Sequence, residues 1–193
     1  ISFSMGADFV VTGSINQCSV EAATSDRVKD LLQKMSIEDT EYTIAGDMFE
    51  IGAKVQVLKK GVLYPVRANT LFNIYTLFRD INELPNTLKQ MLEDQYFRMS
   101  IDDVTRDVEK YFGRAKNAKG HMAIIFRWYL HYSNEWAISG TENRVIDYQI
   151  HTGPALGLFN QWLKGRPEES WRKRHVEWIG EALMDEAALV NFR

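Results

Sequence analysis

The sequence GADFVVTGSINQ runs from Gly6 to Gln17 and joins a short apolar run to a glycine-containing turn. The apolar run, Phe9 to Val11, is typical of a strand buried on both faces, as in a parallel sheet. The small polar residues that follow lead into a stretch with helical character from about Gln17. A strand, a glycine turn and a helix start together place free backbone N–H groups at one point, which suits a phosphate. The same pattern also fits a plain strand-to-helix connection.

The composition predicts a folded protein. Of 193 residues, 45% are hydrophobic and 25% are charged, which is enough apolar surface for a core. The net charge of −3 argues against a nucleic-acid partner. The single cysteine, Cys18, excludes an internal disulfide and favours a reducing, cytoplasmic location. No apolar run approaches the roughly 20 residues of a membrane helix, and the four histidines lack the spacing of a metal site.

Four stretches carry a resemblance, in chain order, to one enzyme family. They are GADFVVTGSINQCSVEAATSD, GDMFEIGAKVQVLKKGVLYPVRAN, FRWYL and DYQIHTGPALGLFNQWLKG, which begin at Gly6, Gly46, Phe126 and Asp147. They resemble the enoyl-reductase subunit (PfaD family) of omega-3 polyunsaturated fatty acid synthases and trans-acyltransferase polyketide synthases. This family is related to the nitronate monooxygenases, or 2-nitropropane dioxygenases. The resemblance covers nearly the whole chain.

The resemblance implies a flavin-binding (β/α)8 barrel of the TIM type, and such a barrel needs about 250 residues. We therefore expect a mainly α chain that holds the last strand and helix of a barrel, followed by a helical C-terminal region of a longer protein. The predicted parts are a barrel end at 1–35, a linker at 36–46 and a helical domain at 47–193. On its own such a piece is expected to be inactive.

The spacing of apolar residues and caps predicts the individual helices. The first predicted helix runs to about Met35, with Ser25 and Asp26 as its N-cap candidates. The others are Asp47 to Gly61, a helix carrying Leu71 to Phe78, one from Pro85 to Tyr96, Ser100 to Gly113, His121 to about Ser139 ended by Gly140, Pro154 to Gly165, and one from near Pro167 to Val190.

The implied activity is that of an FMN-dependent oxidoreductase. It would reduce α,β-unsaturated acyl thioesters on acyl carrier protein in polyunsaturated fatty acid or polyketide biosynthesis, with NADPH or NADH as reductant. By resemblance, Thr12, Gly13 and Ser14 would hold the flavin phosphate in the cytoplasmic enzyme. The catalytic residues would lie upstream of Ile1 and are not assigned.

Other polar residues are candidates for the cleft. Asn16, Gln17 and His151 could line the flavin or substrate mouth, and His151 is the one candidate for a catalytic role. Capping and loop hydrogen bonds also explain Asn16 and Gln17, and they are the favoured explanation for Glu21. A structural histidine is the favoured explanation for His151. Cys18 is expected to be a small buried residue, because no base accompanies it.

Two basic clusters could dock an acidic acyl carrier protein, or could simply be solvated. They are Arg114/Lys116/Lys119 and Arg166/Arg172/Lys173/Arg174. Two other functions stay open: a nitronate-oxidising flavoenzyme, and a non-catalytic helical interaction module of the synthase. A barrel-facing apolar patch could also make the chain a homo-oligomer.

Overall fold

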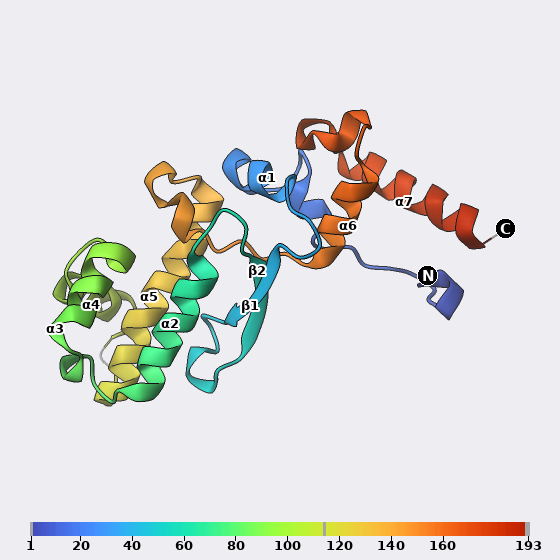
Figure 1. Ribbon diagram of the computed structural model, residues 1–193. Helices are drawn as coiled ribbons and strands as arrows, with labels where there is room; N and C mark the ends of the chain where they lie inside the picture. The colour runs from blue at the N-terminus through green and yellow to red at the C-terminus, as the bar shows by residue number, and fades with distance from the viewer. Residues whose placement is uncertain (1, 114, 192–193) are drawn as a thin grey trace.

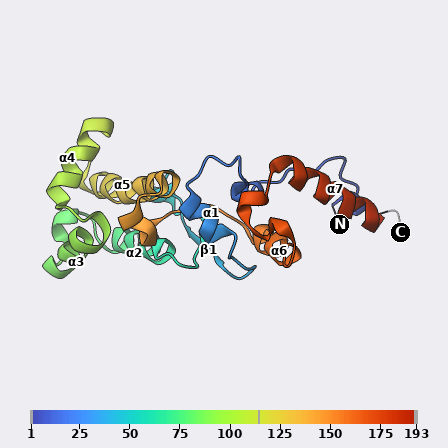
Figure 2. The same ribbon diagram turned by 90° about the horizontal axis from the view of Figure 1, so that it is seen from above.

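The computed structural model describes residues 2–113 and 115–191, with the side chains of Phe112 and Asn191 left out. Ile1 and Arg114, which the sequence analysis used, lie outside this range. The described chain is mainly α, as predicted, and it is elongated (Figure 1). Helices α2 to α5 gather at one end, α6 and α7 lie at the other, and α1 and the hairpin β1–β2 lie between them (Figure 2).

A β-hairpin replaces two predicted features. Residues 36–46 were expected to be a linker, and residues 40–44 within it form a strand. The prediction of a helix that begins at Asp47 is wrong, because residues 54–58 form a second strand. Strand β1 (Thr40–Ile44) pairs antiparallel with β2 (Lys54–Leu58), with Thr40 opposite Leu58. Between the strands, a 3-10 turn (Phe49–Ile51) ends at Gly52, whose φ of +73° favours glycine. The β-branched residues Val55 and Val57 alternate with polar ones, and this strand signal is stronger than the helical spacing.

The larger core lies between the hairpin and a group of helices. These are α2 (Tyr64–Leu77), α3 (Asn86–Met91), the π-helix Leu92–Phe97, α4 (Ile101–Phe112) and α5 (Ala118–Ser139). The predicted caps of two helices are confirmed, because the Ser100 side chain accepts a hydrogen bond from the Asp103 N–H and Gly140 ends α5 in the left-handed conformation. Aromatic rings of α2 and α5 fill much of the interior, with Phe49 packed edge-on against Phe72.

A second core joins the two ends of the chain. Helix α1 (Asp26–Leu32), capped by Ser25 as predicted, packs with α6 (Pro154–Trp162) and α7 (Val176–Asn191). The last helix was expected to begin near Pro167, which is wrong. Two 3-10 turns, Pro167–Glu169 and Trp171–Lys173, come first. Residues of the predicted barrel end thus share a core with residues of the predicted helical domain, and the domain division stays a prediction.

The first residues lie along the surface. Phe9 to Val11 were expected to form a buried strand, but they adopt no strand and are exposed, by 77% for Phe9 and 84% for Val11. A parallel strand needs neighbours for its N–H and C=O groups, and no other described segment pairs with this one. Among the described residues, no helix is long and apolar enough to cross a membrane.

Candidate functional site

The polar turn after the apolar run has free backbone donors. Within the described residues, the N–H groups of Gly13, Ser14 and Ile15 donate to no other group. A Cβ built on Gly13 would meet no atom within 4 Å, so this part of the turn is open. The Ser14 hydroxyl oxygen accepts a hydrogen bond from the Gly153 N–H at 2.9 Å, which leaves its own proton available. This turn can therefore offer several donors to an anion.

Asn16 stabilises the turn from behind. Its side-chain amide donates to the Thr12 carbonyl and hydroxyl oxygens, both at 3.1 Å, and its N–H donates to the Gly13 carbonyl. The structure thus gives Asn16 the local hydrogen-bonding role that the sequence analysis left open beside a role in the cleft.

Gln17 and His151 come together, although they are far apart in the sequence. Both line a small hollow of about 160 Å³, together with Gln149 and Asn134. The Gln17 side-chain oxygen is buried and accepts no hydrogen bond from the described residues. A buried acceptor without a donor is costly, so this atom is ready to receive a hydrogen bond from a ligand or water.

A much larger cleft of about 920 Å³ adjoins this hollow, because His151, Gln149 and Asn134 line both. Its walls come from the hairpin, α4, α5 and residues 149 and 151. Apolar and aromatic side chains line it together with a few polar ones. Besides the three shared residues, the lining comprises Ala45, Gly46, Asp47, Val55, Asp107, Val108, Tyr111, Ile124, Arg127, Trp128, Leu130, His131 and Tyr132.

His151 sits at the junction of the cleft and the hollow. The segment before α6 holds it beside the hairpin through a bridge with Val57. Its Nε2 lies 2.9 Å from the Gln149 side-chain nitrogen. An amide nitrogen can only donate, so Nε2 accepts and the proton of the neutral ring lies on Nδ1. Partial burial lowers the pKa of His151, although the Asp47 charge opposes this effect.

The wall of the cleft on α4 and α5 is fixed by Asp107. Its carboxylate accepts hydrogen bonds from the Trp128 indole N–H at 2.7 Å and from the Tyr132 hydroxyl at 3.3 Å. Burial and this carboxylate raise the pKa of Tyr132. The sequence analysis placed Trp128 and Tyr132 within one predicted helix but missed Asp107, Asn134 and Gln149 as cleft residues. No local signal marks them, because the cleft is formed by segments distant in sequence.

The basic clusters predicted to dock a partner are largely engaged within the fold. Lys119 donates to the carbonyl oxygens of Tyr75 and Phe78 at the end of α2. Arg174 is fully buried, and Arg172 lies 3.7 Å from Asp26 and 3.5 Å from Asp30. Lys119, Arg172 and Arg174 are therefore held by contacts within the fold.

The remaining sequence candidates are structural. Glu21 accepts hydrogen bonds from the His175 ring and the Val176 N–H, which lower its pKa. Cys18 is fully buried, and desolvation raises the pKa of its thiol to about 11, so it is no nucleophile at neutral pH. The described residues contain no group of three or more metal-binding side chains.

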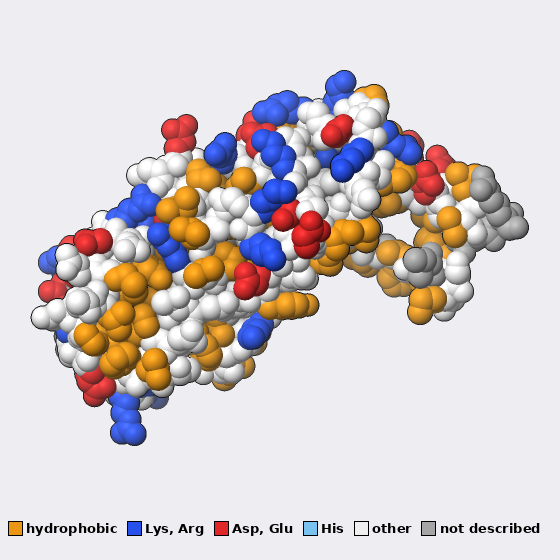
Figure 3. Space-filling model, viewed as in Figure 1, with side chains coloured by type: hydrophobic (Ala, Val, Ile, Leu, Met, Phe, Trp, Pro, Cys, Tyr) orange, Lys and Arg blue, Asp and Glu red, His pale blue; other side chains and the backbone are white. Residues whose placement is uncertain are grey.

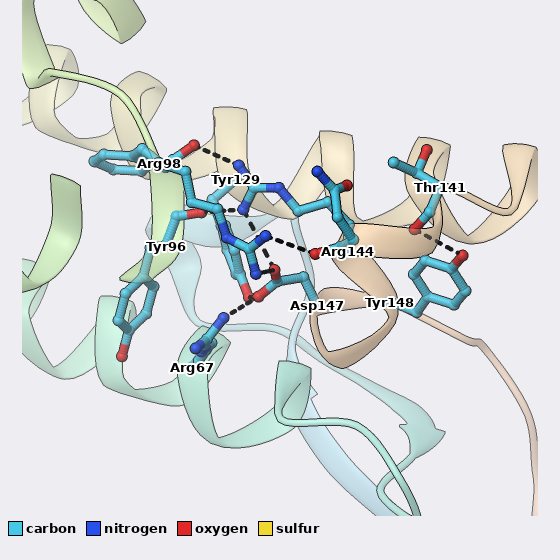
Figure 4. Close-up of polar contacts among 10 residues, drawn as sticks. Arg67, Tyr96, Arg98, Tyr129, Thr141, Arg144, Asp147 and Tyr148 are labelled. Atoms are coloured by element: carbon cyan, nitrogen blue, oxygen red, sulfur yellow. Dashed lines mark hydrogen bonds and ion pairs between the residues drawn. The ribbon is translucent and has the colours of Figure 1, made fainter. Parts of the chain in front are cut away.

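A buried charge cluster surrounds Asp147 (Figure 4). The Asp147 carboxylate is fully buried and accepts from Arg67, from the Tyr129 hydroxyl at 2.8 Å and from Arg144 at 3.3 Å, with Arg98 at 3.5 Å. Arg144 also donates to the carbonyl oxygens of residues 96 and 97 at the end of the π-helix. The cluster therefore ties α2, the π-helix, α5 and the 3-10 turn Glu142–Asp147 to one carboxylate. Its members are scattered along the chain, and the sequence analysis missed it.

Comparisons with known proteins agree with the predicted resemblance. The chain is 55% identical over 195 residues to the polyketide biosynthesis protein PksE of Bacillus subtilis, covering 98% of this chain and 25% of that protein. It is 37% identical over 175 residues to a polyunsaturated fatty acid synthase component of Thraustochytrium sp., covering 85% of this chain and 12% of that protein. Residues 78–148 match the family model of the inserted helical domain of [acyl-carrier-protein] S-malonyltransferase.

A solved structure has the same fold. The crystal structure of the enoyl reductase domain of MlnA, from the macrolactin biosynthesis cluster of Bacillus amyloliquefaciens, superposes with a TM-score of 0.94 at 45% identity. The match covers 98% of this chain and 44% of the MlnA chain. The predicted resemblance is confirmed: the chain is related to polyketide and polyunsaturated fatty acid synthase proteins. Within them it corresponds to part of an enoyl reductase-like domain, and it spans a quarter or less of the curated relatives described here.

Proposed function

We propose that this chain forms the C-terminal part of an FMN-dependent enoyl reductase that acts on α,β-unsaturated acyl thioesters carried by acyl carrier protein. The observation that carries the proposal is the fold match to an enoyl reductase domain over nearly the whole chain. In this proposal the exposed run Phe9 to Val11 would gain strand partners only from barrel strands in the rest of the protein. Its exposed apolar side chains are consistent with a surface that further protein covers.

The turn fits a flavin phosphate. Thr12, Gly13 and Ser14 would hold it, since the N–H groups of Gly13, Ser14 and Ile15 have no acceptor among the described residues and the Gly13 side is open. The Ser14 hydroxyl can donate to a phosphate oxygen while it still accepts from Gly153. The bound flavin would supply the hydride, with NADPH or NADH as the reductant.

The large cleft is proposed to bind the acyl thioester. Its aromatic and aliphatic walls suit a hydrocarbon chain, and its few polar groups can orient a polar end. At the junction with the hollow, Gln149 holds His151 so that the Nδ1 proton can be donated to a carbonyl oxygen. The Gln17 side-chain oxygen, which has no donor among the described residues, could accept a hydrogen bond from an amide N–H of the carrier protein's phosphopantetheine arm. His151 is thus the candidate to orient the acyl group.

The test uses the full-length protein that carries this chain. A yellow protein that oxidises NADPH or NADH in the presence of a crotonyl thioester supports the proposal. Turnover of alkyl nitronates without enoyl reduction would favour a nitronate-oxidising enzyme, and a colourless protein that still binds the synthase would favour a non-catalytic module.

Two glycine variants test the phosphate turn. Gly13→Ala is expected to lower flavin content, because the added methyl group would stand where the phosphate approaches the backbone. Gly180→Ala is the matched control, since a Cβ there also meets no atom within 4 Å. Equal flavin content in both variants would reject this turn as the phosphate site.

A further inference from the structure

The arginines around Asp147 carry more charge than their carboxylate can balance. Arg67, Arg98 and Arg144 face one Asp147. No other carboxylate within the described residues forms an ion pair with any of them, so the cluster has an excess of two positive charges. Low-dielectric surroundings make such an excess felt more strongly than on an open surface.

The three arginines differ in their exposure. The side chain of Arg144 is 9% exposed, with its guanidinium 4.0 Å from the centre of the Trp136 ring. The side chain of Arg98 is 34% exposed, and its other nitrogen donates to the Asn143 carbonyl at 2.6 Å. The excess charge therefore reaches the surface at Arg98.

The backbone holds Arg98 in an unusual conformation. It is the described non-glycine residue with a positive φ, of +57°, and it lies directly after the π-helix. A side chain in this region costs about 1 kcal/mol or more, so it persists where the surroundings fix it. Here the contacts to Asn143 and Asp147 do so. Arg98 is thus a fixed cation rather than a freely moving surface arginine.

Exposed apolar side chains lie on the segments that carry and contact Arg98 and its partners. Leu63 and Val66 lie at the start of α2, Met99 follows Arg98, and Ile146 precedes Asp147. The Leu63 N–H donates to the Ile146 carbonyl at 2.7 Å, which joins α2 to the 3-10 turn. The space-filling view shows basic and apolar side chains side by side over this region of α2 and the turn (Figure 3). We call Leu63, Val66, Arg67, Arg98, Met99 and Ile146 the arginine patch.

We propose that the arginine patch docks an acidic acyl carrier protein domain of the synthase. This inference rests on the proposed function for its partner and replaces the two basic clusters expected from the sequence. The unbalanced positive charge would attract an acidic surface, and the exposed apolar side chains would be buried by it. Arg172 pairs with two carboxylates and Lys119 is held by two carbonyl oxygens, whereas Arg98 belongs to a cluster in which three arginines share one carboxylate.

Direct binding tests the patch without any requirement for catalysis. The full-length protein is titrated with a carrier domain from the same synthase that bears the phosphopantetheine arm but no acyl group. Arg98→Glu is expected to weaken binding about tenfold, with the effect reduced in high salt. Arg172→Glu, an exposed arginine in the other basic region, is the control and should change the Kd less than about twofold.

Two further measurements separate docking from folding and from catalysis. Arg98→Gly removes the charge and relieves the left-handed backbone, so it should weaken binding without lowering the melting temperature. Val66→Ser tests the apolar part and should also weaken binding. Reduction of a small crotonyl thioester should be the same in Arg98→Gly and the parent, because that substrate does not dock. Unchanged carrier binding in Arg98→Glu, or loss in Arg172→Glu alone, would overturn the proposal, whether or not the protein reduces enoyl thioesters.

Discussion

Asp147 and Arg174 are the charged residues of the described chain with no exposed surface, and they are balanced in opposite ways. Asp147, in the part built around α2 and α5, faces three arginines. Arg174, in the part built around α1 and α6, has no ion pair within the described residues. Its guanidinium donates instead to the carbonyls of Glu168 and Glu169, to Asn160 at 2.8 Å and to the Cys18 sulfur. Asp147 thus faces an excess of opposite charge, whereas Arg174 is bound by neutral hydrogen-bond acceptors.

This difference separates the Asp147 cluster, which reaches the surface, from Arg174, which only holds buried segments together. Neutral acceptors around Arg174 satisfy its hydrogen-bonding capacity, and the side chain does not reach solvent, so its role is to fix the second core. The Asp147 cluster combines an internal joint with a charge that reaches solvent. A basic residue in the sequence is therefore a poor guide to binding until its partners are known.

The largest expected effect comes from removing the Asp147 charge. Asp147→Asn leaves three guanidinium groups facing one another and should lower the free energy of unfolding by about 4 kcal/mol. Denaturant unfolding measures this. Asp26→Asn, which removes an exposed ion-pair partner, should cost at most about 1 kcal/mol. A similar loss of unfolding free energy in both variants would contradict the special contribution of the buried Asp147 carboxylate to stability.

A slightly smaller loss of unfolding free energy is expected when Arg174 is replaced. Arg174→Met fills much of the same volume but leaves Asn160 and two backbone carbonyls without their donor, at a cost of about 3 kcal/mol. The loss should not depend on salt, since no ion pair is broken, whereas the Asp147→Asn loss should. Equal salt dependence in the two variants would remove the distinction between the sites.

Helix α6 carries Asn160, which accepts a hydrogen bond from Arg174, and a methyl group added at Gly157 would push this helix away from residues 36 and 37. A Cβ on Gly157 would lie 2.4 Å from the Ser36 carbonyl carbon and 2.5 Å from the Ile37 nitrogen. Gly157→Ala must therefore shift backbone and should cost about 2 kcal/mol in thermal unfolding. The control, Gly180→Ala on α7, should be neutral or stabilising by up to about 1 kcal/mol. A neutral Gly157→Ala would show that α6 moves freely against residues 36 and 37.

The smallest effect concerns Cys18, which lies 3.4 Å from Arg174. Burial raises its thiol pKa from 9.0 to about 11, so the folded protein binds more protons than the unfolded chain between these values. Stability should therefore fall as pH rises from 9 to 11, and Cys18→Ala should lose less stability over this range. At a pH of about 8, below both values, iodoacetamide should label the thiol only after unfolding. Rapid labelling of the folded protein would contradict the buried site.

Sequence patterns located features that depend on neighbouring residues. The caps Ser25, Ser100 and Gly140 act within one helical turn, and the structure confirms them. The hairpin was missed because Val55 and Leu58 also fit helical spacing, and pairing with β1 decides between the two. The strand expected at Phe9 to Val11 needs partners that the described chain lacks.

The candidate functional site shows the same difference between features set by neighbouring residues and features set by distant ones. Resemblance pointed to the turn at Thr12 to Ser14, and the sequence analysis named His151 as a candidate for the cleft. The structure adds that Gln17 and His151 share one hollow. Asp107 and the Asp147 cluster could not be predicted, because their partners come from helices distant in the sequence. Periodicity assigns a residue to a face of its own helix but not to the helix opposite.

The stretch from residue 147 to residue 153 touches every functional feature. Asp147 organises the arginine patch, Gln149 and His151 line the cleft, and the Gly153 N–H holds Ser14 in the polar turn. Since these residues lie within seven positions of the chain, adding or deleting a single amino acid here would misalign the arginine patch, the cleft and the polar turn at once. We expect evolution to tolerate substitutions along this stretch more readily than any change in its length.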